Sequence, residues 1–543
     1  MLRSFPCPPL RLARALLDRA TTAAKTNVAT ASLVALVATA SFVAVATAAA
    51  PPAAAATAEI GPDDDLSAAL AQLEAGDELL LAPGTYTLTA PVELRSQASA
   101  GSPISVRSAQ GRDTVVIDGG KPIQLVDAPF WQIEDLTFEN TPVRLVSEQA
   151  DGFEYHARLA GNHFVGQGVL LRNASAVELA GNHFQDVRSM KADVDRHAMH
   201  FVGASSDLTV TGNVVENASA DSIQAQGQVD DVVVEGNEFR VNRPHPSDDP
   251  FCSTGENAID IKRAQRWTIR DNYFHGFQRV PGCGAFDSTS VGGEAIVIHK
   301  HGARDFEILD NRFEDNSVHL LIAGKTCIAG GTDCSGPLLT EGVRVEGNSF
   351  RDTDVPGESV GVRVTPGVGV AELEDPVGPI GVSIVGNTFD GIPLVVDVRA
   401  RTFETNGGPV FATPADVAVI DNLHYGGRLR LAPEADVEEA GNDDVDAPEE
   451  LQTAGTDASD TTDTTDAIDG ATPTTDQPAS TRTPSTLATP STSATSQLAG
   501  PPSDGEPGFG WAWIGIFAIA AGTLAAVAVL LRARLLRQRE VVD

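Results

Sequence analysis

Two copies of one pattern decide the fold of this chain. The first copy reads Gly255-Glu256-Asn257-Ala258-Ile259-Asp260-Ile261-Lys262 and closes with Asp271-Asn272-Tyr273-Phe274. The second copy reads Gly293-Glu294-Ala295-Ile296-Val297-Ile298-His299-Lys300-His301-Gly302 and closes with Asp310-Asn311-Arg312-Phe313. Each copy holds an alternating strand, a short polar step and a second strand that ends in Gly or Asp, Asn, any residue, Phe. Residues of the same kind would lie over one another, which predicts a stack of repeating coils.

The closing signature recurs along much of the chain. It is centred on nine asparagines, which are separated by 20 to 39 residues: Asn162, Asn182, Asn213, Asn237, Asn272, Asn311, Asn348, Asn387 and Asn422. A solenoid coil of about 20 to 25 residues fits the shortest spacings, and the longer spacings carry loops. Asn tolerates the left-handed turn conformation and can bond to the Asn of the next coil, which predicts a ladder of asparagines. The Phe two residues later should point inward and stack.

From Ala58 to Ala432 the sequence resembles the right-handed parallel β-helix proteins of the pectate-lyase-like group. The resemblance implies an all-β, right-handed parallel β-helix solenoid. It also implies that the short amphipathic helix expected at Asp65–Leu73, with its acidic start, caps the first coil. A β-propeller is the alternative, but its blades need four regular strands per repeat and Trp-Asp marks. The sequence has neither feature.

The two ends of the chain have compositions of their own. Residues 1–57 carry basic residues and then an uncharged apolar run, which predicts a secretory signal, with an uncleaved anchor as the alternative. Residues 433–507 are rich in Ser, Thr, Asp and Pro and predict a disordered stalk. An apolar segment at 508–531 predicts a transmembrane helix, followed by a basic cytoplasmic tail at 532–543. We therefore expect a single-pass membrane protein whose 58–432 domain is extracellular.

The charge balance narrows the choice of partners. The chain has 38 basic and 74 acidic residues, for a formal net charge of −36. No basic stripe offsets this field, so binding to nucleic acid through phosphates is not expected. An acidic polysaccharide would need either a local basic groove or a bridging cation. We expect the protein to act as a monomer.

Four cysteines remain after the signal: Cys252, Cys283, Cys327 and Cys334. In an oxidising compartment an even number favours disulfides, and we expect Cys252–Cys283 and Cys327–Cys334, because each pair would staple a loop. Zinc binding is the alternative, but no C-x-x-C spacing is present.

Aligning the strands before each Asn step predicts a functional patch. The third position holds Met199, Ile223, Ile259 and Ile296 and should face the interior. The opposite face should carry one column of His200, Gln224, Asp260 and Val297, and a second column of Val202, Gln226, Lys262 and His299. The first position holds His197, Asp221, Asn257 and Glu294. Its parity is inward, but it lies at the strand start, where a corner can turn it to solvent.

This patch resembles polysaccharide lyase family six, the alginate lyases and chondroitinase B. Glu256, Asn257 and Lys262 match that family's strand of calcium ligands ending in a Lys base, and Lys300-His301-Gly302 matches its Arg-His-Gly with Lys in place of Arg. The resemblance implies β-elimination on a uronic acid, in which a cation neutralises the C6 carboxylate and Lys262 removes the C5 proton. Neighbouring cations should lower the pKa of Lys262. His299, Lys300 or His301 would bind the carboxylate or protonate the leaving oxygen.

The remaining members of the patch complete the prediction. Asp260, Gln226 and His200 are expected to contact substrate. Calcium would take Asp221, Asn257, Glu294 and Glu256 as ligands, fewer than the roughly six oxygens it prefers.

Plainer interpretations stay open. Lys262 would then be a solvated strand-end lysine that pairs with Asp260, and His299-Lys300-His301 a polar surface turn. A metal site at Asp193, Asp195, His197 and His200 is less favoured, because His-x-x-His on a strand puts the two rings on opposite faces.

Two classes of function follow. The first is a cell-surface lyase on a uronic-acid polymer, and the second is a non-catalytic carbohydrate-binding or adhesion module. A hydrolase of the polygalacturonase type ranks last, because only Asp221 and Asp260 lie on adjacent coils.

Overall fold

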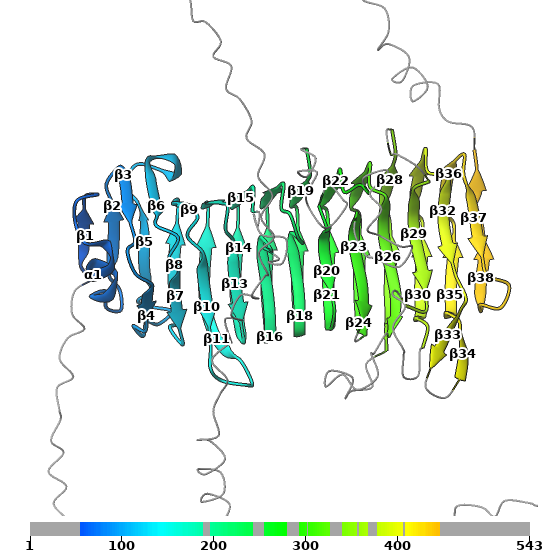
Figure 1. Ribbon diagram of the computed structural model, residues 1–543, viewed down its shortest axis with the longest axis horizontal. Helices are drawn as coiled ribbons and strands as arrows, with labels where there is room; N and C mark the ends of the chain where they lie inside the picture. Colours follow the sequence, from blue (N-terminus) through cyan, green and yellow to red (C-terminus); the bar gives the residue numbers. More distant parts are fainter. Residues whose placement is uncertain are drawn as a thin grey trace, which may run out of the picture. The chain divides into compact units, whose positions relative to one another are not determined.

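The computed structural model describes residues 55–187, 196–242, 255–279, 293–300, 302–325, 339–353, 355, 358–367, 377–405 and 408–445. Figure 1 shows that these residues form parallel strands stacked coil upon coil, in the same order as the sequence. Most coils have three strands, so the stack has three faces, here called the first, second and third face in chain order. The sequence-based prediction of an all-β parallel solenoid is confirmed.

The first face begins each coil and bears the predicted patch. Its strands pair in parallel along the stack. They are β4 (Val92–Leu94), β7 (Ile123–Val126), β10 (Val143–Val146), β13 (Val169–Arg172), β20 (Asn257–Ile261), β23 (Glu294–Lys300), β26 (Val318–Lys325), β29 (Val360–Thr365), β32 (Leu394–Val398) and β37 (Arg428–Leu431). Two long strands, β16 (Met199–Thr211) and β18 (Ile223–Glu235), run on from the first face into the second.

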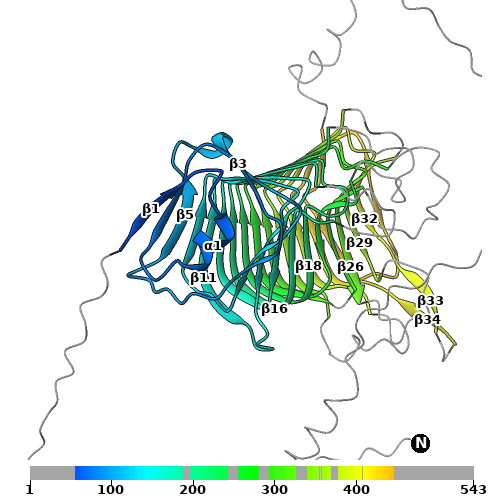
Figure 2. The same cartoon turned by 60° about the vertical axis from the view of Figure 1, so that its left-hand side comes forward.

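The second face follows within each coil, and Figure 2 shows its strands stacked beside those of the first. Its strands also pair in parallel. They are β1 (Thr57–Ile60), β2 (Glu78–Leu81), β5 (Ile104–Ser108), β8 (Trp131–Glu134), β11 (Phe153–Ala160), β14 (Ala174–Ala180), β21 (Ala264–Arg270), β24 (Ala303–Leu309), β27 (Glu341–Glu346), β30 (Ile380–Val385), β35 (Ala415–Ile420) and β38 (Val437–Ala440).

The third face is a separate sheet of short strands, and from β12 onward each of these strands follows an Asn step. Its strands are β3 (Gly84–Thr87), β6 (Val115–Asp118), β9 (Thr137–Glu139), β12 (His163–Val165), β15 (His183–Gln185), β17 (Val214–Glu216), β19 (Glu238–Arg240), β22 (Tyr273–His275), β25 (Arg312–Glu314), β28 (Ser349–Arg351), β31 (Thr388–Asp390), β36 (Leu423–Tyr425) and β39 (Asp443–Asp444). An antiparallel pair, β33 (Arg401–Thr405) and β34 (Gly408–Ala412), leaves the stack near its C-terminal end.

The asparagines form a continuous ladder inside the corner between the second and third faces. Each Nδ2 group donates to the Oδ1 atom of the next Asn, as Asn162 does to Asn182 at 3.1 Å and Asn272 to Asn311 at 3.0 Å. The same Oδ1 atom also accepts a backbone N–H, from Asn162 in the first case. The ladder has one more rung than the sequence predicted, Asn442, which lies beyond the expected end of the domain at residue 432.

The left-handed residue of this corner is not the Asn. Positive φ values occur instead at the residue before it, for example Gly161 at 63° and Asp271 at 57°. Asn tolerates the left-handed conformation, but in this corner the preceding residue adopts it. Gly has no Cβ to clash and Asp tolerates this region, so either residue fits before the Asn, whose side chain is left to form the ladder.

The Phe of the signature packs inside the stack as expected. Phe274 and Phe313 stack with ring centroids 4.9 Å apart, and Phe313 and Phe350 with centroids 4.7 Å apart. Such pairs add about 0.5–1.5 kcal/mol each beyond their area burial. These rings and the inward residues of all three faces form one hydrophobic core.

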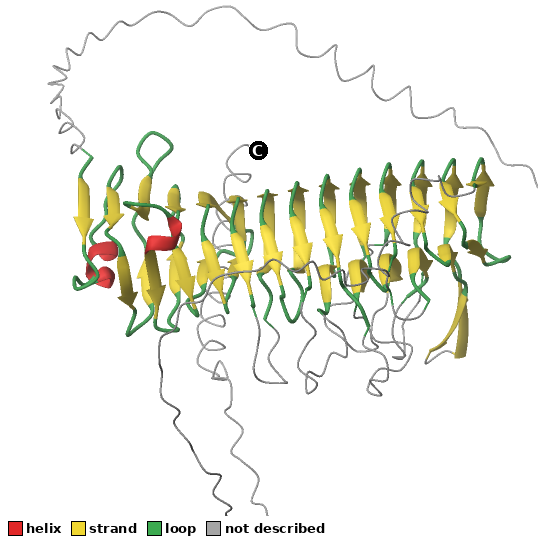
Figure 3. Cartoon of the chain, turned by 90° about the horizontal axis from the view of Figure 1, so that it is seen from above, coloured by secondary structure: helices red, strands yellow, loops and turns green. Residues whose placement is uncertain are grey.

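The predicted N-terminal helix is present as α1 (Leu66–Ala71), drawn in red in Figure 3 with the single turn η1 (Arg112–Thr114). Asp65 is its N-cap and accepts a bond from the Ala68 N–H. Leu66 and Leu70 are buried in the main core. Whether the helix serves as a cap for the stack stays a prediction.

Several predictions lie outside the described residues. They are the signal, the transmembrane helix, the cytoplasmic tail, most of the stalk and all four cysteines: Cys252, Cys283, Cys327 and Cys334. Across the part of the chain that the structure describes, no helix has the length and apolar character needed to cross a membrane.

Candidate functional site

The strand register confirms the predicted inward column and the outward column of His200, Gln224, Asp260 and Val297, and in the second outward column it pairs Val202 with Gln226. Asp260 pairs with Gln224 on one side and with Val297 on the other. His200 pairs with Gln224 one coil earlier. The inward column is Met199, Ile223, Ile259 and Ile296, all buried without exposed surface. Residues from four successive coils therefore meet on one patch.

Asp260 is the centre of a buried ion-pair cluster. One of its oxygens lies 2.7 Å from Nε2 of His299, and the other lies 3.2 Å from Nζ of Lys262. The side chains of Asp260 and His299 are nearly buried, whereas that of Lys262 is 16% exposed. The pairing of Lys262 with Asp260 that the sequence left open is thus present. Lys262 is the member of this cluster that a ligand would reach first.

Asp221 is the centre of a second buried cluster one coil earlier. Its carboxylate accepts bonds from Nδ2 of Asn257 at 2.8 Å and from Nε2 of Gln224 at 2.9 Å. Nδ1 of His197 lies 3.3 Å from it. At the first position, Asp221, Asn257 and Glu294 are buried and His197 is partly buried, so the corner does not turn the three later residues to solvent.

The charges of the two clusters act on each other. Burial alone would lower the pKa of Lys262, but the negative charge of Asp260, with Asp221 and Glu256 adding to it, outweighs burial and raises it. The expected lowering of the Lys262 pKa is therefore wrong, because carboxylates rather than cations dominate its surroundings. Burial would raise the pKa of Asp260, but His299 and Lys262 together hold it well below its usual range.

His200 is kept neutral at the edge of the patch. Burial, followed by the charges of His197 and Lys262, lowers its pKa to about 4. Its ring lies 4.8 Å from the His197 ring between centroids, so these rings do not point to opposite faces. The alternation rule fails here because His197 precedes β16, which begins at Met199. Gln226, the other predicted substrate contact, is exposed.

The expected calcium ligands do not form a ligand set. Asp221 faces amide donors, and Oε1 of Glu294 accepts a bond of 2.6 Å from Arg279. Among the described residues, no three His, Cys, Asp or Glu side chains gather as a metal site would require. These residues as arranged do not fit a resident calcium ion, and calcium stays a prediction that a binding measurement would test.

The remaining predicted residues are placed only in part. Lys300 ends β23, and its backbone pairs with that of Lys325. His301, Asp193 and Asp195 lie outside the described residues. The structure therefore brings together Lys262, Asp260 and His299, together with the Asp221 cluster.

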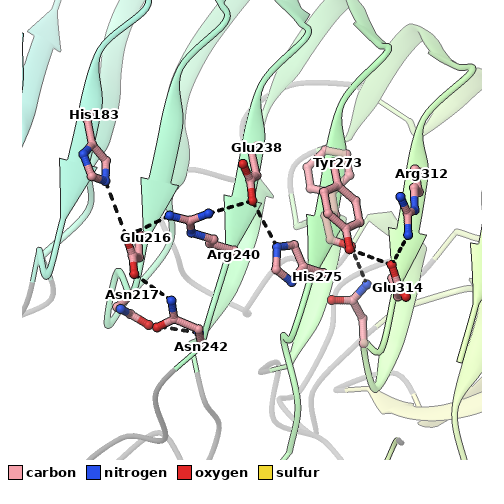
Figure 4. Close-up of polar contacts among 12 residues, drawn as sticks. His183, Glu216, Asn217, Glu238, Arg240, Asn242, Tyr273, His275, Arg312 and Glu314 are labelled. Carbon is pink, nitrogen blue, oxygen red and sulfur yellow. Dashed lines mark hydrogen bonds and ion pairs between the residues drawn. The ribbon is translucent and has the colours of Figure 1, made fainter. Parts of the chain in front are cut away.

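A second polar row, on the outer side of the third face, was not predicted (Figure 4). Glu216 binds Arg240 at 3.1 Å, and Arg240 also contacts Glu238 at 3.0 Å. Further along, the Tyr273 hydroxyl donates to Glu314 at 2.6 Å. The residues on either side of the inward Phe face outward on every rung, so the repeat itself contains the signal for this row.

The comparisons with known proteins agree with this architecture. A family model described as "Right handed beta helix region" matches residues 131–395, slightly less than half of the chain. No curated protein matches the sequence.

Solved structures give further matches at low identity. One is a mannuronic acid specific polysaccharide family 6 lyase from human gut microbiota, with 16% identity and a TM-score of 0.41, covering 73% of this chain and 93% of that one. Another is an alginate lyase from Paenibacillus sp. str. FPU-7, with 15% identity and a TM-score of 0.33, covering 71% and 99%. A third is the catalytic domain of a GH87 alpha-1,3-glucanase, with 10% identity and a TM-score of 0.43, covering 73% and 70%. From the family model and the stacked parallel coils, we conclude that this chain contains a right-handed parallel β-helix.

Proposed function

We propose that this β-helix is a cell-surface enzyme that acts on an acidic polysaccharide by β-elimination beside a uronic acid. The observation that supports it most is the placement of Lys262, partly exposed at 16% next to the buried pair of Asp260 and His299. In such a reaction a base removes the C5 proton, the bond from C4 to the leaving oxygen breaks as that oxygen takes up a proton, and a C4–C5 double bond forms. A positive group must offset the C6 carboxylate as charge builds on it.

Lys262 is assigned as the base, and its environment sets the pH at which it works. The carboxylate of Asp260 holds its pKa above the ordinary value, so Lys262 is mostly protonated near neutral pH. Only the neutral amine can accept the C5 proton. Below that pKa the neutral fraction grows about tenfold with each pH unit, and kcat/KM should rise with it.

The first experiment asks whether elimination occurs at all. The purified full-length protein is incubated with alginate, pectate and glycosaminoglycans, with and without calcium, while the ultraviolet absorbance of unsaturated uronic ends is recorded. We expect an increase on one acidic polymer and its loss in Lys262→Ala. Lys121→Ala, at an exposed lysine away from the patch, is the matched control. Absence of any signal across the panel would reject the lyase assignment.

The second experiment tests the role of Lys262. Arginine keeps the positive charge but does not lose its proton. If Lys262 is the base, Lys262→Arg is as inactive as Lys262→Ala, and the rate of the wild type climbs toward alkaline pH. An active Lys262→Arg enzyme with a flat pH profile would instead show that Lys262 binds the substrate carboxylate.

A non-catalytic carbohydrate-binding module is the second candidate, and one observation favours it. The carboxylates of Asp221, Asp260 and Glu294 all bind neighbouring side chains, so none of them is poised as a free base. This candidate predicts that a polyuronate binds without turnover. Equilibrium binding measured beside the absorbance assay separates the two functions.

A further inference from the structure

Three arginines surround one buried aspartate further along the first face. Asp397 on β32 has no exposed surface. Arg363 on β29 and Arg430 on β37 are its neighbours in the strand register, and Arg399 follows two residues later. Nε of Arg363 lies 2.8 Å from Asp397 and Nε of Arg399 lies 2.7 Å from it. Arg430 forms a fork of two bonds of 2.6 Å.

The cluster holds more positive charge than its carboxylate can offset. The two bonds from Arg430 already satisfy the geometry that a carboxylate prefers. Arg363 and Arg399 bring two further charges to the same acid. Burial and the repulsion from Arg363, with Arg430 contributing, lower the pKa of Arg399 despite the contact with Asp397. Neutralising Asp397 therefore does not account for three guanidinium groups.

Two of these groups are open to solvent. The side chains of Arg399 and Arg430 are each 43% exposed, whereas that of Arg363 is 15% exposed. Arg399 uses its Nε on Asp397, and among the described residues no hydrogen bond occupies its two Nη groups. A guanidinium has five N–H donors in a plane that matches a carboxylate. The cluster thus presents free donors and surplus charge on a chain with a net charge of −36.

We propose that Arg363, Arg399 and Arg430 form a binding site for the carboxylate groups of an acidic polysaccharide. The choice of ligand class rests on the proposed function, while the site itself is separate from Lys262. In the same column, Val297 and Leu321 lie between Asp260 and Arg363, and both are buried. At about 4.8 Å for each rung, Asp260 and Arg363 are roughly 14 Å apart. The site would hold the polymer on the protein, independently of bond cleavage.

The test measures the equilibrium binding of polysaccharides to the full-length protein. Bond cleavage is not part of the readout. The Lys262→Ala background is used so that no polymer is consumed. The probes are an alginate oligosaccharide, dextran sulfate and neutral dextran. We expect the alginate oligosaccharide to bind, and Arg399→Gln and Arg430→Gln each to weaken it about tenfold. Asp397→Asn should bind it more tightly, because removing the acid leaves three unopposed charges.

The arginine variants are expected to weaken binding and Asp397→Asn to strengthen it, and these opposite effects separate a binding role from a structural role. All three variants remove contacts of Asp397, so a purely structural cluster would change thermal stability without strengthening binding in any of them. Arg344→Gln, at a guanidinium on the second face with 48% exposure, is the matched control. If Asp397→Asn does not fold, the affinity of Arg399→Gln for the alginate oligosaccharide decides between the two roles. In that variant Asp397 keeps Arg363 and Arg430 as partners.

Specific outcomes would overturn the proposal. They are unchanged binding in Arg399→Gln, an equal loss in Arg344→Gln, or equal binding of neutral dextran. Tighter binding of dextran sulfate than of alginate would overturn the assignment to carboxylates. Because binding is measured apart from cleavage, a protein that fails the elimination assay but loses alginate binding in Arg399→Gln would refute the lyase assignment and retain this site.

Discussion

Replacing Asn272 by Ala in the middle of the ladder should destabilise the stack strongly. Nδ2 of Asn272 donates to the carbonyl of Val234 at 2.9 Å and to Oδ1 of Asn311 at 3.0 Å. Its Oδ1 accepts both the backbone N–H and the Nδ2 of Asn237, each at 2.9 Å. The substitution removes these four bonds and a fifth, from Nδ2 to the Arg270 carbonyl at 2.9 Å, and it leaves the buried N–H of Asn237 without this acceptor.

The size of the effect follows from these losses. A hydrogen bond contributes about 1 kcal/mol net, and a buried donor left unsatisfied costs about 1–3 kcal/mol more. Neighbouring coils cannot close over the gap, because the backbone spacing is fixed by the strands on both sides. We expect Asn272→Ala to lower the free energy of unfolding by about 3–5 kcal/mol.

The end of the ladder supplies the matched control. Asn442 is only partly buried, and it accepts from Asn422 and donates to the Val419 carbonyl at 2.7 Å. Water can replace its bonds, so Asn442→Ala should cost about 1 kcal/mol.

Urea unfolding followed by far-ultraviolet circular dichroism gives the midpoints, and hydrogen exchange reports the coils beside the substitution. Stacked coils need not unfold in one step, so the transition that includes the central coils is compared. Equal shifts for Asn272→Ala and Asn442→Ala, or a shift of Asn272→Ala within about 0.5 kcal/mol of the wild type, would refute the ladder's role.

Two further predictions concern backbone fit and pH. Gly276 has a φ of +83°, and an added Cβ would lie 2.2 Å from the Val241 carbonyl, so Gly276→Ala should lower the unfolding midpoint far more than Gly212→Ala, whose Cβ would meet nothing within 4 Å. His200 has its pKa lowered from 6.5 to about 4, so the unfolded chain binds the proton more tightly and stability falls as pH drops through this window. Between pH 7 and pH 5 we expect a loss of about 2 kcal/mol, which His200→Asn removes and substitution of the exposed His156 does not.

The fold was predictable because the repeat places like residues in like positions. An Asn every 20 to 39 residues, followed by an inward Phe, fixes both the corner and the side of the next strand. Once Met199, Ile223, Ile259 and Ile296 are aligned as an inward column, the outward columns follow from alternation alone. The same alternation places Asp260 and Lys262 on one face of their strand.

The sequence-based expectations fail where a conformation or a pKa depends on several neighbouring groups at once. Gly and Asp share the position before each Asn, and their common property is tolerance of positive φ, which marks this position as the left-handed residue of the corner. The pKa of Lys262 depends on distances to Asp260, Asp221 and Glu256 that a column alignment does not supply. His197 was treated as a strand residue, although β16 begins only at Met199.

The arginine cluster has a signal in the sequence. Arg363, Asp397 and Arg430 are separated by 34 and 33 residues, which is one coil each at this end of the chain. Continuing the column of Asp260 through later coils would have aligned them. The extended column contains two basic residues and one acidic residue, which is the surplus of positive charge seen in the structure.

Asp260 and Asp397 occupy the same column of the first face, and each is a buried carboxylate that holds cations. The difference lies in the charge that remains. At Asp260 one Lys and one His share the acid, and Asp221 adds a second negative charge nearby, so little positive field reaches the solvent. At Asp397 three guanidinium groups share one acid, and two of them are exposed. The first arrangement suits control of a proton, and the second suits attraction of a polyanion. A lyase needs both, whereas a binding module needs only the second, so Lys262 and Arg399 variants separate the two functions.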